Sequence, residues 1–365
     1  MKVWKKSLAA LLAVMMLLSM AACGQKEEEE PEATIGQETT QPVEEETPEE
    51  VPAEDPVTVR AAALKGPTAM GLVQLMDRFG VAPTVQEEPV ALGDLKAGEN
   101  GYSFILAAAA DEVTPLLIKG DLDVACVPAN LASVLYNKTE GQIVTLGINT
   151  LGVLYIVENG DSVQSLEDLK GQTIVASGKG STPEYGLRYL LAQNGIDPDK
   201  DVTIEWKSEH SECVAALASG AAAIALLPQP FVTVAQGKIE SLRIALDLTA
   251  EWDALENGSA MITGVVVTRK AFVEEHPAAV DKFLQDYAES VEWVNANHAD
   301  AAALIGGYGI VDAAVAEKAL PYCNIVCITG SEMKDKLSGY LNALAEQAPE
   351  SVGGKVPADD FYYVG

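Results

Sequence analysis

The stretch that decides the fold is residues 165–191, SLEDLKGQTIVASGKGSTPEYGLRYLL. Ser165 can cap a short turn, because Asp168 stands in the capping-box position and a glycine follows to end the turn. Residues 173–176 form a short β-branched run, which predicts a buried strand. A loop of Gly, Ser, Lys and Thr then leads into an amphipathic helix that opens with Pro183. A loop of this kind at a helix N-terminus presents free backbone N–H groups, which suit a small polar ligand.

The same construction recurs along the chain. Strands or buried apolar runs are expected at residues 57–63, 102–107, 123–127, 143–149, 151–157, 173–176, 202–206, 223–227, 242–246 and 261–268. Helices are expected at residues 67–79, 111–119, 128–138, 183–193, 211–219 and from about 231, and the chain after 268 is expected to be helical to its end. This alternation predicts an α/β protein with mainly parallel sheets flanked by helices. Ligands of such sheets sit beyond the carboxyl ends of the strands.

The N-terminus has the features of an exported protein. Three lysines stand among the first six residues, and an apolar run at residues 8–20 follows that is too short for a comfortable membrane span. The run ends in Ala-Ala-Cys23, which resembles the bacterial lipobox, where the Cys becomes the lipidated first residue. We expect residues 1–22 to be a lipoprotein signal peptide. The alternative is an ordinary signal peptide with an incidental Cys.

Residues 23–56 are typical of a tether. They contain runs of glutamate at 27–30 and 44–46, with Pro, Thr and Gln between them and no aromatic residue. Such a segment cannot bury enough apolar surface to offset its ordering entropy, and its charges repel one another. We expect a lipidated Cys23 followed by a disordered acidic stalk.

The charge balance excludes one class of partner. The chain carries 54 acidic and 24 basic residues, for a net charge of −30, and the part after the stalk stays acidic. Nucleic-acid binding needs basic stripes, so no nucleic-acid partner is expected. The length beyond residue 56 exceeds what one core usually serves, which predicts two lobes.

Motifs for metals, cofactors and catalysis are missing from the sequence. The three His and five Cys form no zinc pattern. Lys179 is followed by Gly, with no Gly five places before it, so its loop is not a phosphate-binding P-loop. Neither a Gly-x-Ser-x-Gly elbow nor a dinucleotide fingerprint occurs. We therefore expect no metal, no cofactor and no catalytic residue.

The cysteines after the lipobox allow two interpretations. Cys323 and Cys327 could form a disulfide only through a tight turn. We favour buried free thiols for this pair and for Cys126 and Cys213, because Cys behaves as a small hydrophobe.

Five blocks together resemble a known family. They are LKGPTAM at 64–70, GDLDVA at 120–125, SLEDLKG at 165–171, GST at 180–182 and LPQP at 227–230. The chain resembles the solute-binding lipoproteins of ABC importers, in the branch for nitrate, sulfonate, taurine and thiamine-pyrimidine precursors, from residue 57 to the C-terminus. The resemblance implies a two-lobed, periplasmic-binding-protein-like (type II) fold. Residues 57–157 and 247–365 would form lobe I, and residues 158–246 lobe II.

The resemblance also implies a function. The protein would capture a small polar, anionic or heteroaromatic solute between its lobes and deliver it to a permease driven by a separate ATPase. It would be an exported monomer, lipid-anchored at the outer face of the bacterial cytoplasmic membrane. Two alternatives stay open, a cell-surface enzyme with His210 or Glu209 as acid–base and a ligand sensor or adhesion module.

Twelve residues are candidate ligand contacts because of their loop positions. Lobe I would offer Lys65, Thr68, Ala69, Met70, Asn130 and Asn149, and lobe II would offer Ser181, Thr182, Tyr185, Glu209, His210 and Gln229. The helix N-termini among these loops favour an anionic or strongly polar group.

Each candidate also has a plainer interpretation. The hydroxyls of Thr68, Ser181 and Thr182 either meet the ligand or only cap their helices. Lys65 either pairs with an acid on the ligand or is a solvated surface residue.

The remaining candidates of lobe II are open in the same way. Glu209 and His210 either face the cleft or form a polar first turn. Tyr185 either stacks on a flat ligand, as Trp252 could, or belongs to the core.

Overall fold

The computed structural model describes residues 57–80, 82, 84–85 and 101–365. These residues belong to one compact unit that covers residues 53–365. The expected signal peptide, Cys23 and the stalk lie outside the described residues. Within the described ranges, no helix has both the length and the apolar character needed to cross a lipid bilayer.

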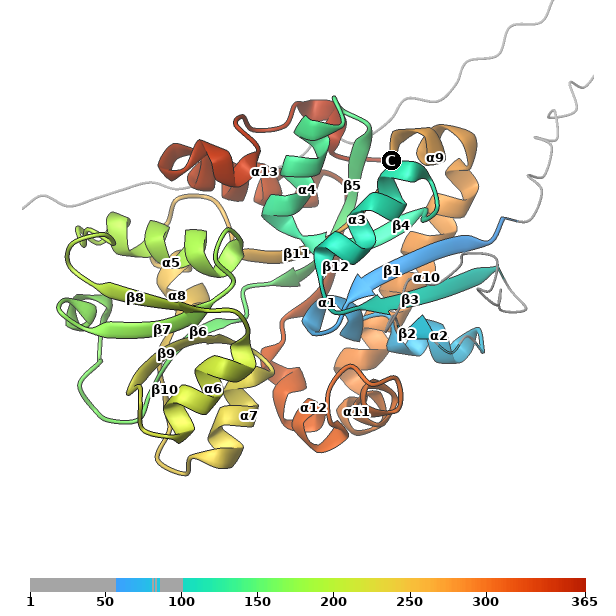
Figure 1. Ribbon diagram of the computed structural model, residues 1–365. Coiled ribbons are helices and arrows are strands. Elements are labelled where there is room, and N and C mark those ends of the chain that lie inside the picture. Colours follow the sequence, from blue (N-terminus) through green and yellow to red (C-terminus); the bar gives the residue numbers. More distant parts are fainter. Residues whose placement is uncertain (1–56, 81, 83, 86–100) are drawn as a thin grey trace, which may run out of the picture. The chain divides into compact units, whose positions relative to one another are not determined.

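Two β-sheets organise this unit (Figure 1). The first has the strand order β12-β5-β11-β4-β1-β3-β2 and the second the order β10-β6-β9-β7-β8. The strands of the first sheet are β1 (Val59–Leu64), β2 (Thr84–Val85), β3 (Tyr102–Ala107), β4 (Val124–Pro128), β5 (Ile143–Leu151), β11 (Ile262–Arg269) and β12 (Ile325–Ile328). Those of the second sheet are β6 (Leu154–Glu158), β7 (Thr173–Ser177), β8 (Thr203–Lys207), β9 (Ile224–Pro228) and β10 (Arg243–Asp247).

Helices connect most of these strands. They are α1 (Pro67–Met70), α2 (Val73–Arg78), α3 (Ala110–Lys119), α4 (Ala129–Lys138), α5 (Thr182–Gln193), α6 (His210–Ala218), α7 (Phe231–Lys238), α8 (Leu248–Asp253), α9 (Lys270–Glu275), α10 (Pro277–Ala296), α11 (His298–Gly307), α12 (Ala313–Ala319) and α13 (Gly330–Gln347). Short 3₁₀ turns lie at Leu166–Leu169, Leu320–Tyr322, Pro349–Val352 and Asp359–Phe361.

Both sheets are mixed, although most strands of each run in the same direction. In the first, β1 pairs in parallel with β3 and β4, whereas β11 is antiparallel to β4 and β5, and β12 to β5. In the second, β7 is parallel to β8 and β9, and β6 runs the other way between β9 and β10. The predicted fold class, α/β with two sheets flanked by helices, is confirmed, and the sheets are parallel in the direction of most strands rather than in most of their pairings.

The helices cover both faces of each sheet, which explains the apolar strand sequences. In the second sheet, α5 and α8 lie over one face and α6 and α7 over the other (Figure 1). Neighbouring residues of β7 therefore enter different clusters. Ile174 and Ala176 pack with the side chains of α5, and Val175 packs with those of α6.

The first turn of the deciding stretch forms as its sequence predicts. Asp168 Oδ2 accepts hydrogen bonds from the backbone N–H of Ser165 at 2.9 Å and from its hydroxyl at 3.0 Å. Gly171 then takes a φ of 75°, which a glycine adopts without strain. The turn ends there, and β7 begins at Thr173.

The passage from the first sheet to the second differs from the predicted boundary. β5 continues through Thr150 to Leu151, and β6 already pairs with strands of the second sheet. The chain therefore changes sheets at residues 152–153, whereas the predicted lobe I extends to residue 157. The division into lobes itself stays a prediction.

The helix predicted at residues 67–79 is interrupted at Gly71. The Ser290 hydroxyl donates to the Gly71 carbonyl at 2.7 Å and accepts from the Leu75 N–H at 3.0 Å. It thus lies between two groups that would bond to each other in a continuous helix. The packing of α10 against this segment therefore separates α1 from α2.

The expectation of helix to the end of the chain is wrong at β12. Ile325–Ile328 pairs with β5 at the edge of the first sheet. Four residues are too few to show a period, and their pairing partner lies far away in the sequence. The strand therefore depends on a long-range contact.

Candidate functional site

A cavity of about 200 Å³ lies between the two sheets, beyond the carboxyl ends of β1, β4, β7 and β9. From the first sheet and its loops it is lined by Leu64, Lys65, Gly66, Pro67, Thr68, Pro128 and Thr263. From the passage between the sheets and from the second sheet it is lined by Val153, Leu154, Gly178, Ser181, Thr182, Pro183, His210, Pro228, Gln229, Pro230 and Phe231. Its position is the one expected for a ligand of open α/β sheets.

Four helices of eight residues or more begin at this cavity. Thr182 is the first residue of α5, His210 of α6 and Phe231 of α7, while Pro128 is the N-cap of α4. Each helix start carries a partial positive charge and unpaired N–H groups. Together they favour a group that is negative or rich in hydrogen-bond acceptors.

Six of the twelve predicted contacts line the cavity: Lys65, Thr68, Ser181, Thr182, His210 and Gln229. The two sheets thus bring together six residues that are far apart in the sequence. Their role in binding a ligand stays a prediction.

Four of the other six lie in the interior or in a separate groove. Ala69 and Met70 are fully buried in the core beneath α1. Asn130 donates to the Ser351 carbonyl at 3.2 Å. Tyr185 lines a groove away from the cavity.

Asn149 and Glu209 lie near the cavity but are not part of its lining. The Asn149 amide donates to the Thr68 carbonyl at 3.2 Å and so helps to hold this lining residue in position. Glu209 is exposed at the N-cap of α6. Its carboxylate accepts from the Ser211 hydroxyl at 3.0 Å.

The lining hydroxyls differ in what they bind. Thr68 donates to the Leu64 carbonyl at 2.9 Å and Ser181 to the Gly178 carbonyl at 2.7 Å, so both serve their own loops. Thr182 is 2% exposed, and its Oγ1 lies beside the buried Tyr340 hydroxyl without forming a bond of full hydrogen-bond geometry to any described residue. A buried hydroxyl without a full hydrogen bond is costly, and a ligand that accepts from Thr182 would remove that cost.

Gln229 presents its amide nitrogen to the cavity. Its Oε1 accepts from the backbone N–H of Thr233 at 3.3 Å and from the Thr233 hydroxyl at 2.9 Å. These two bonds fix the orientation of the side-chain amide, because only the oxygen can accept. The Nε2 group is left as a donor.

His210 is held in place on two sides. Its Nδ1 is hydrogen-bonded to Ser177 Oγ, and its ring packs against Phe231 with a centroid distance of 5.0 Å. Burial lowers the pKa of His210 to about 4. The ring is therefore neutral at pH 7, and its Nε2 is the remaining polar atom.

Sequence reasoning missed Thr263 and Phe231 as lining residues. Phe231 follows the Pro-Gln-Pro loop and is the first residue of α7. Thr263 is the second residue of β11, a strand that starts at the cavity because it runs antiparallel to β4. The direction of β11 was not readable from local pattern, so no signal placed Thr263 here.

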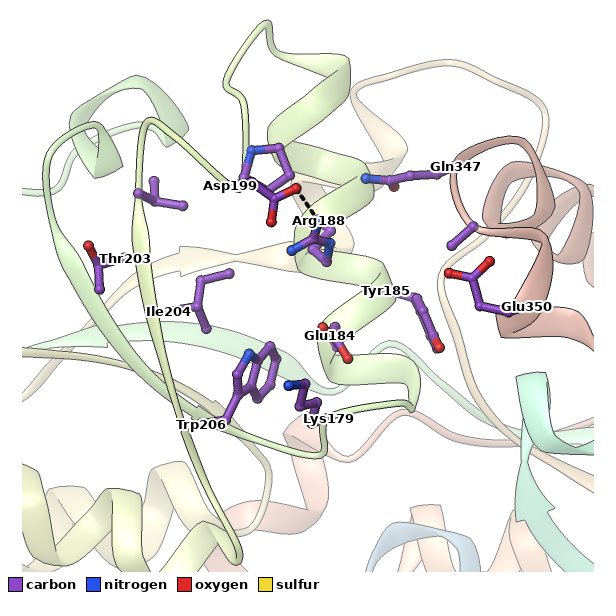
Figure 2. Close-up of a pocket in the computed structure, with 13 residues that line it drawn as sticks. Lys179, Glu184, Tyr185, Arg188, Asp199, Thr203, Ile204, Trp206, Gln347 and Glu350 are labelled. Atoms are coloured by element: carbon purple, nitrogen blue, oxygen red, sulfur yellow. Dashed lines mark hydrogen bonds and ion pairs between the residues drawn. The ribbon is translucent and has the colours of Figure 1, made fainter.

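A second hollow of about 680 Å³ lies beside α5, the edge strand β8 and the end of α13 (Figure 2). The rings of Tyr185 and Trp206 line it. Arg188 and Asp199 also line it and form an ion pair, with 2.8 Å between Nη2 and Oδ2. The groove runs along β8 and mixes both signs of charge. Ligands of α/β sheets bind at the carboxyl ends of strands, so the cavity is a better candidate for the ligand site than this groove.

Trp252 is part of the core. It is fully buried, with Tyr189 at 4.6 Å and Tyr340 at 5.4 Å between ring centroids. Its Nε1 donates to Ser259 Oγ at 2.9 Å. Both ring faces are covered, so stacking on a ligand is excluded in this conformation.

The four cysteines of the described chain are free thiols. Cys126, Cys213 and Cys323 are buried and Cys327 is half-buried. Among the described residues, His, Cys, Asp and Glu form no cluster of three that could hold a metal ion.

A family model matches residues 97–317 of the chain. Its description is "ABC transporter, phosphonate, periplasmic substrate-binding protein". A comparison with curated proteins gives no significant match.

Several solved structures share the fold. An ABC transporter from Parabacteroides distasonis has a TM-score of 0.67 at 22% identity, covering 85% of this chain and 99% of that one. The periplasmic aliphatic sulphonate binding protein SsuA from Escherichia coli has 0.65 at 16%, covering 85% and 92%. The alkanesulfonate-binding protein SsuA from Xanthomonas axonopodis pv. citri, bound to MOPS, has 0.60 at 15%, covering 86% and 98%. At these identities the likeness establishes the fold alone.

Proposed function

Because the chain belongs to the family of periplasmic substrate-binding proteins of phosphonate ABC transporters, we propose that it captures a small solute between two lobes and delivers it to a permease driven by a separate ATPase. The resemblance seen in the sequence blocks is confirmed at the level of ABC-importer binding proteins. The solute, the lobes and the binding residues are the parts that we propose.

The observation that carries the proposal is the shared cavity. Lys65 and Thr68 approach it from the first sheet, and Thr182, His210 and Gln229 approach it from the second. A solute that contacts both sides stabilises the closed arrangement, because only that arrangement provides every contact. The permease could then distinguish loaded from empty protein.

The chemistry of the lining supports a small polar, anionic or heteroaromatic solute. Helix starts and the Lys65 ammonium favour a negative group, and Phe231 with the lining prolines offers apolar surface. Phosphonates enter the proposal through the family description, and sulfonates through the names of two solved structures. Nitrate, taurine and pyrimidine precursors enter through the sequence resemblance.

We further propose export and attachment by a lipid on Cys23 to the outer face of the cytoplasmic membrane. The lysines, the short apolar run and the Ala-Ala-Cys sequence support this. The tether at residues 24–56 would separate the folded unit from the membrane.

Thermal unfolding with a ligand panel tests the proposal. Nitrate, ethanesulfonate, taurine, methylphosphonate and a pyrimidine are each added at matched ionic strength, with glucose as a neutral control. A solute at 100 times its Kd stabilises by about 2.7 kcal/mol, which raises Tm measurably. A rise with at least one panel member and none with glucose supports transport. If no small solute raises Tm and none is released from the purified protein on denaturation, the proposal is wrong.

A further inference from the structure

We propose that the cavity selects an acceptor-rich solute that carries no ammonium group. The inference rests on the proposed function, since it specifies which solutes the same cavity accepts. The cavity would bind alkylphosphonates and alkylsulfonates more tightly than their 2-amino analogues, which carry the same anionic group.

Three polar groups of the lining can donate to a solute. The Thr182 hydroxyl is buried beside the Tyr340 hydroxyl and forms no bond of full hydrogen-bond geometry within the described part of the chain, so it can still donate. Gln229 presents its amide nitrogen, because its oxygen already accepts two hydrogen bonds from Thr233. Lys65 adds an ammonium at the rim. A solute that meets these groups must supply acceptors.

Acidic side chains do not occur among the described residues that line the cavity. The two nearest in sequence to the lining are turned elsewhere. Glu184 Oε2 accepts from the Gly180 N–H at 2.7 Å, and its side chain lines the groove beside β8 (Figure 2). Glu209 is exposed and bonded to Ser211. An ammonium in the cavity would thus find no counter-charge.

Three backbone carbonyls at the cavity each already accept one hydrogen bond from the protein. The Leu64 carbonyl accepts from Thr68, the Gly178 carbonyl from Ser181, and the Val153 carbonyl from the Gln229 N–H at 3.0 Å. His210 is a neutral ring, and Lys65 repels a second cation. Burying an ammonium without a paired charge costs several times what a neutral group of equal size costs. The amino analogue should therefore bind at least tenfold more weakly.

Matched ligands test this by calorimetry on the purified full-length protein. Ethanesulfonate, 2-hydroxyethanesulfonate and 2-aminoethanesulfonate differ only at the second carbon, and ethylphosphonate is paired with 2-aminoethylphosphonate. The hydroxyl analogue controls for size and polarity. We expect each amino compound to bind more than tenfold more weakly than its unsubstituted partner, and the hydroxyl compound within tenfold. Equal binding, or a loss of tenfold or less for the amino compounds, overturns the inference.

A charge swap provides an independent arm. Gln229→Glu keeps the shape of the side chain and places a carboxylate oxygen where Nε2 now faces the cavity. We expect its preference between the amino and unsubstituted compounds to shift at least tenfold toward the amino compound. Gln193→Glu, which adds the same charge at an exposed position of α5, should leave the preference unchanged. No shift in Gln229→Glu overturns the inference.

The mass of solute released from the denatured protein, purified from its own host, separates two kinds of failure. A released solute with a protonatable amine overturns the selectivity and leaves the transport function intact. Neither released solute nor binding of any compound overturns the transport function and the selectivity with it.

Discussion

His210 Nδ1 and Ser177 Oγ are hydrogen-bonded where α6 begins beside the end of β7. This bond joins the loop after β8 to the neighbouring strand of the same sheet. It also determines which ring nitrogen of His210 stays available. The position of the ring in the cavity is therefore fixed before any solute arrives.

The burial of His210 makes stability depend on pH. The native pKa is about 4, against 6.5 for the unperturbed group, so the unfolded chain binds a proton that the folded one does not. Stability from this group is complete above pH 6.5 and is lost as pH falls from 6.5 toward 4. The loss is roughly 3 kcal/mol at most. Denaturant unfolding at pH 7 and pH 4.5 should show a smaller decrease for His210→Gln than for the wild type.

A second histidine, His298, provides the control for this measurement. His298→Gln removes a histidine at the start of α11, away from the cavity. It should retain the wild-type decrease between the two pH values. If His210→Gln and the wild type lose the same free energy, the neutral buried state assigned to His210 is wrong.

Thr182→Val should weaken solute binding without destabilising the protein. Among the described residues, the hydroxyl makes no bond of full hydrogen-bond geometry, and the neighbouring Tyr340 hydroxyl has none in the wild type either, so the substitution breaks no such bond. A lost hydrogen bond to a charged acceptor should raise Kd about tenfold or more. Calorimetry gives Kd, and thermal unfolding without solute should give a Tm equal to or above that of the wild type.

Thr173→Val is the matched control for Thr182→Val, because Thr173 is exposed at the start of β7. It should leave Kd unchanged. A Thr182→Val protein with wild-type Kd for its best solute would show that this hydroxyl does not face the ligand.

Asp123 should contribute stability rather than binding. It is 2% exposed, pairs with Arg60 at 2.6 Å and with Arg269 at 3.0 Å, and lies outside the cavity lining. Asp123→Asn leaves both guanidinium groups without a counter-charge and should cost about 2 kcal/mol, since the arginines are partly solvated. Denaturant unfolding should show the loss while Kd stays constant.

The exposed pair of Arg188 and Asp199 tests this distinction. Asp199→Asn breaks an ion pair whose acid is 70% exposed, so the cost should stay below about 1 kcal/mol. Equal losses in Asp123→Asn and Asp199→Asn would contradict the difference in burial.

Cys23→Ser should release the protein from the membrane. A serine cannot form the thioether that carries the lipid, whereas the rest of the sequence is unchanged. Cell fractionation should find the wild type in the membrane fraction and the variant in the soluble extracytoplasmic fraction. Recovery of both proteins in the soluble fraction would favour an ordinary signal peptide.

Local sequence predicted most strands and helices, because β-branched runs and capping residues act over a few positions. The capping box at Ser165 and the start of α5 are examples. The directions of β11 and β12 were not predictable in this way, because pairing with β5 decides them and lies more than 100 residues away.

The residues of the candidate site were likewise predictable only in part from local sequence. Thr182 and Gln229 are predicted correctly as lining residues, because Thr182 begins the helix after the β7 loop and Gln229 follows β9 directly. Ala69 and Met70 were chosen for the same reason, yet the tight turn of α1 buries both side chains in the core. Loop position indicates which residues come near a cavity, but the rotation of each helix decides which side chains enter it.

A crystal structure of the protein with the tightest-binding solute of the panel tests the central claim most directly. We predict density for the solute in the cavity, within hydrogen-bond distance of Thr182 Oγ1 and Gln229 Nε2. Density in the groove beside Trp206, or a solute that contacts only one of the two sheets, would contradict the account.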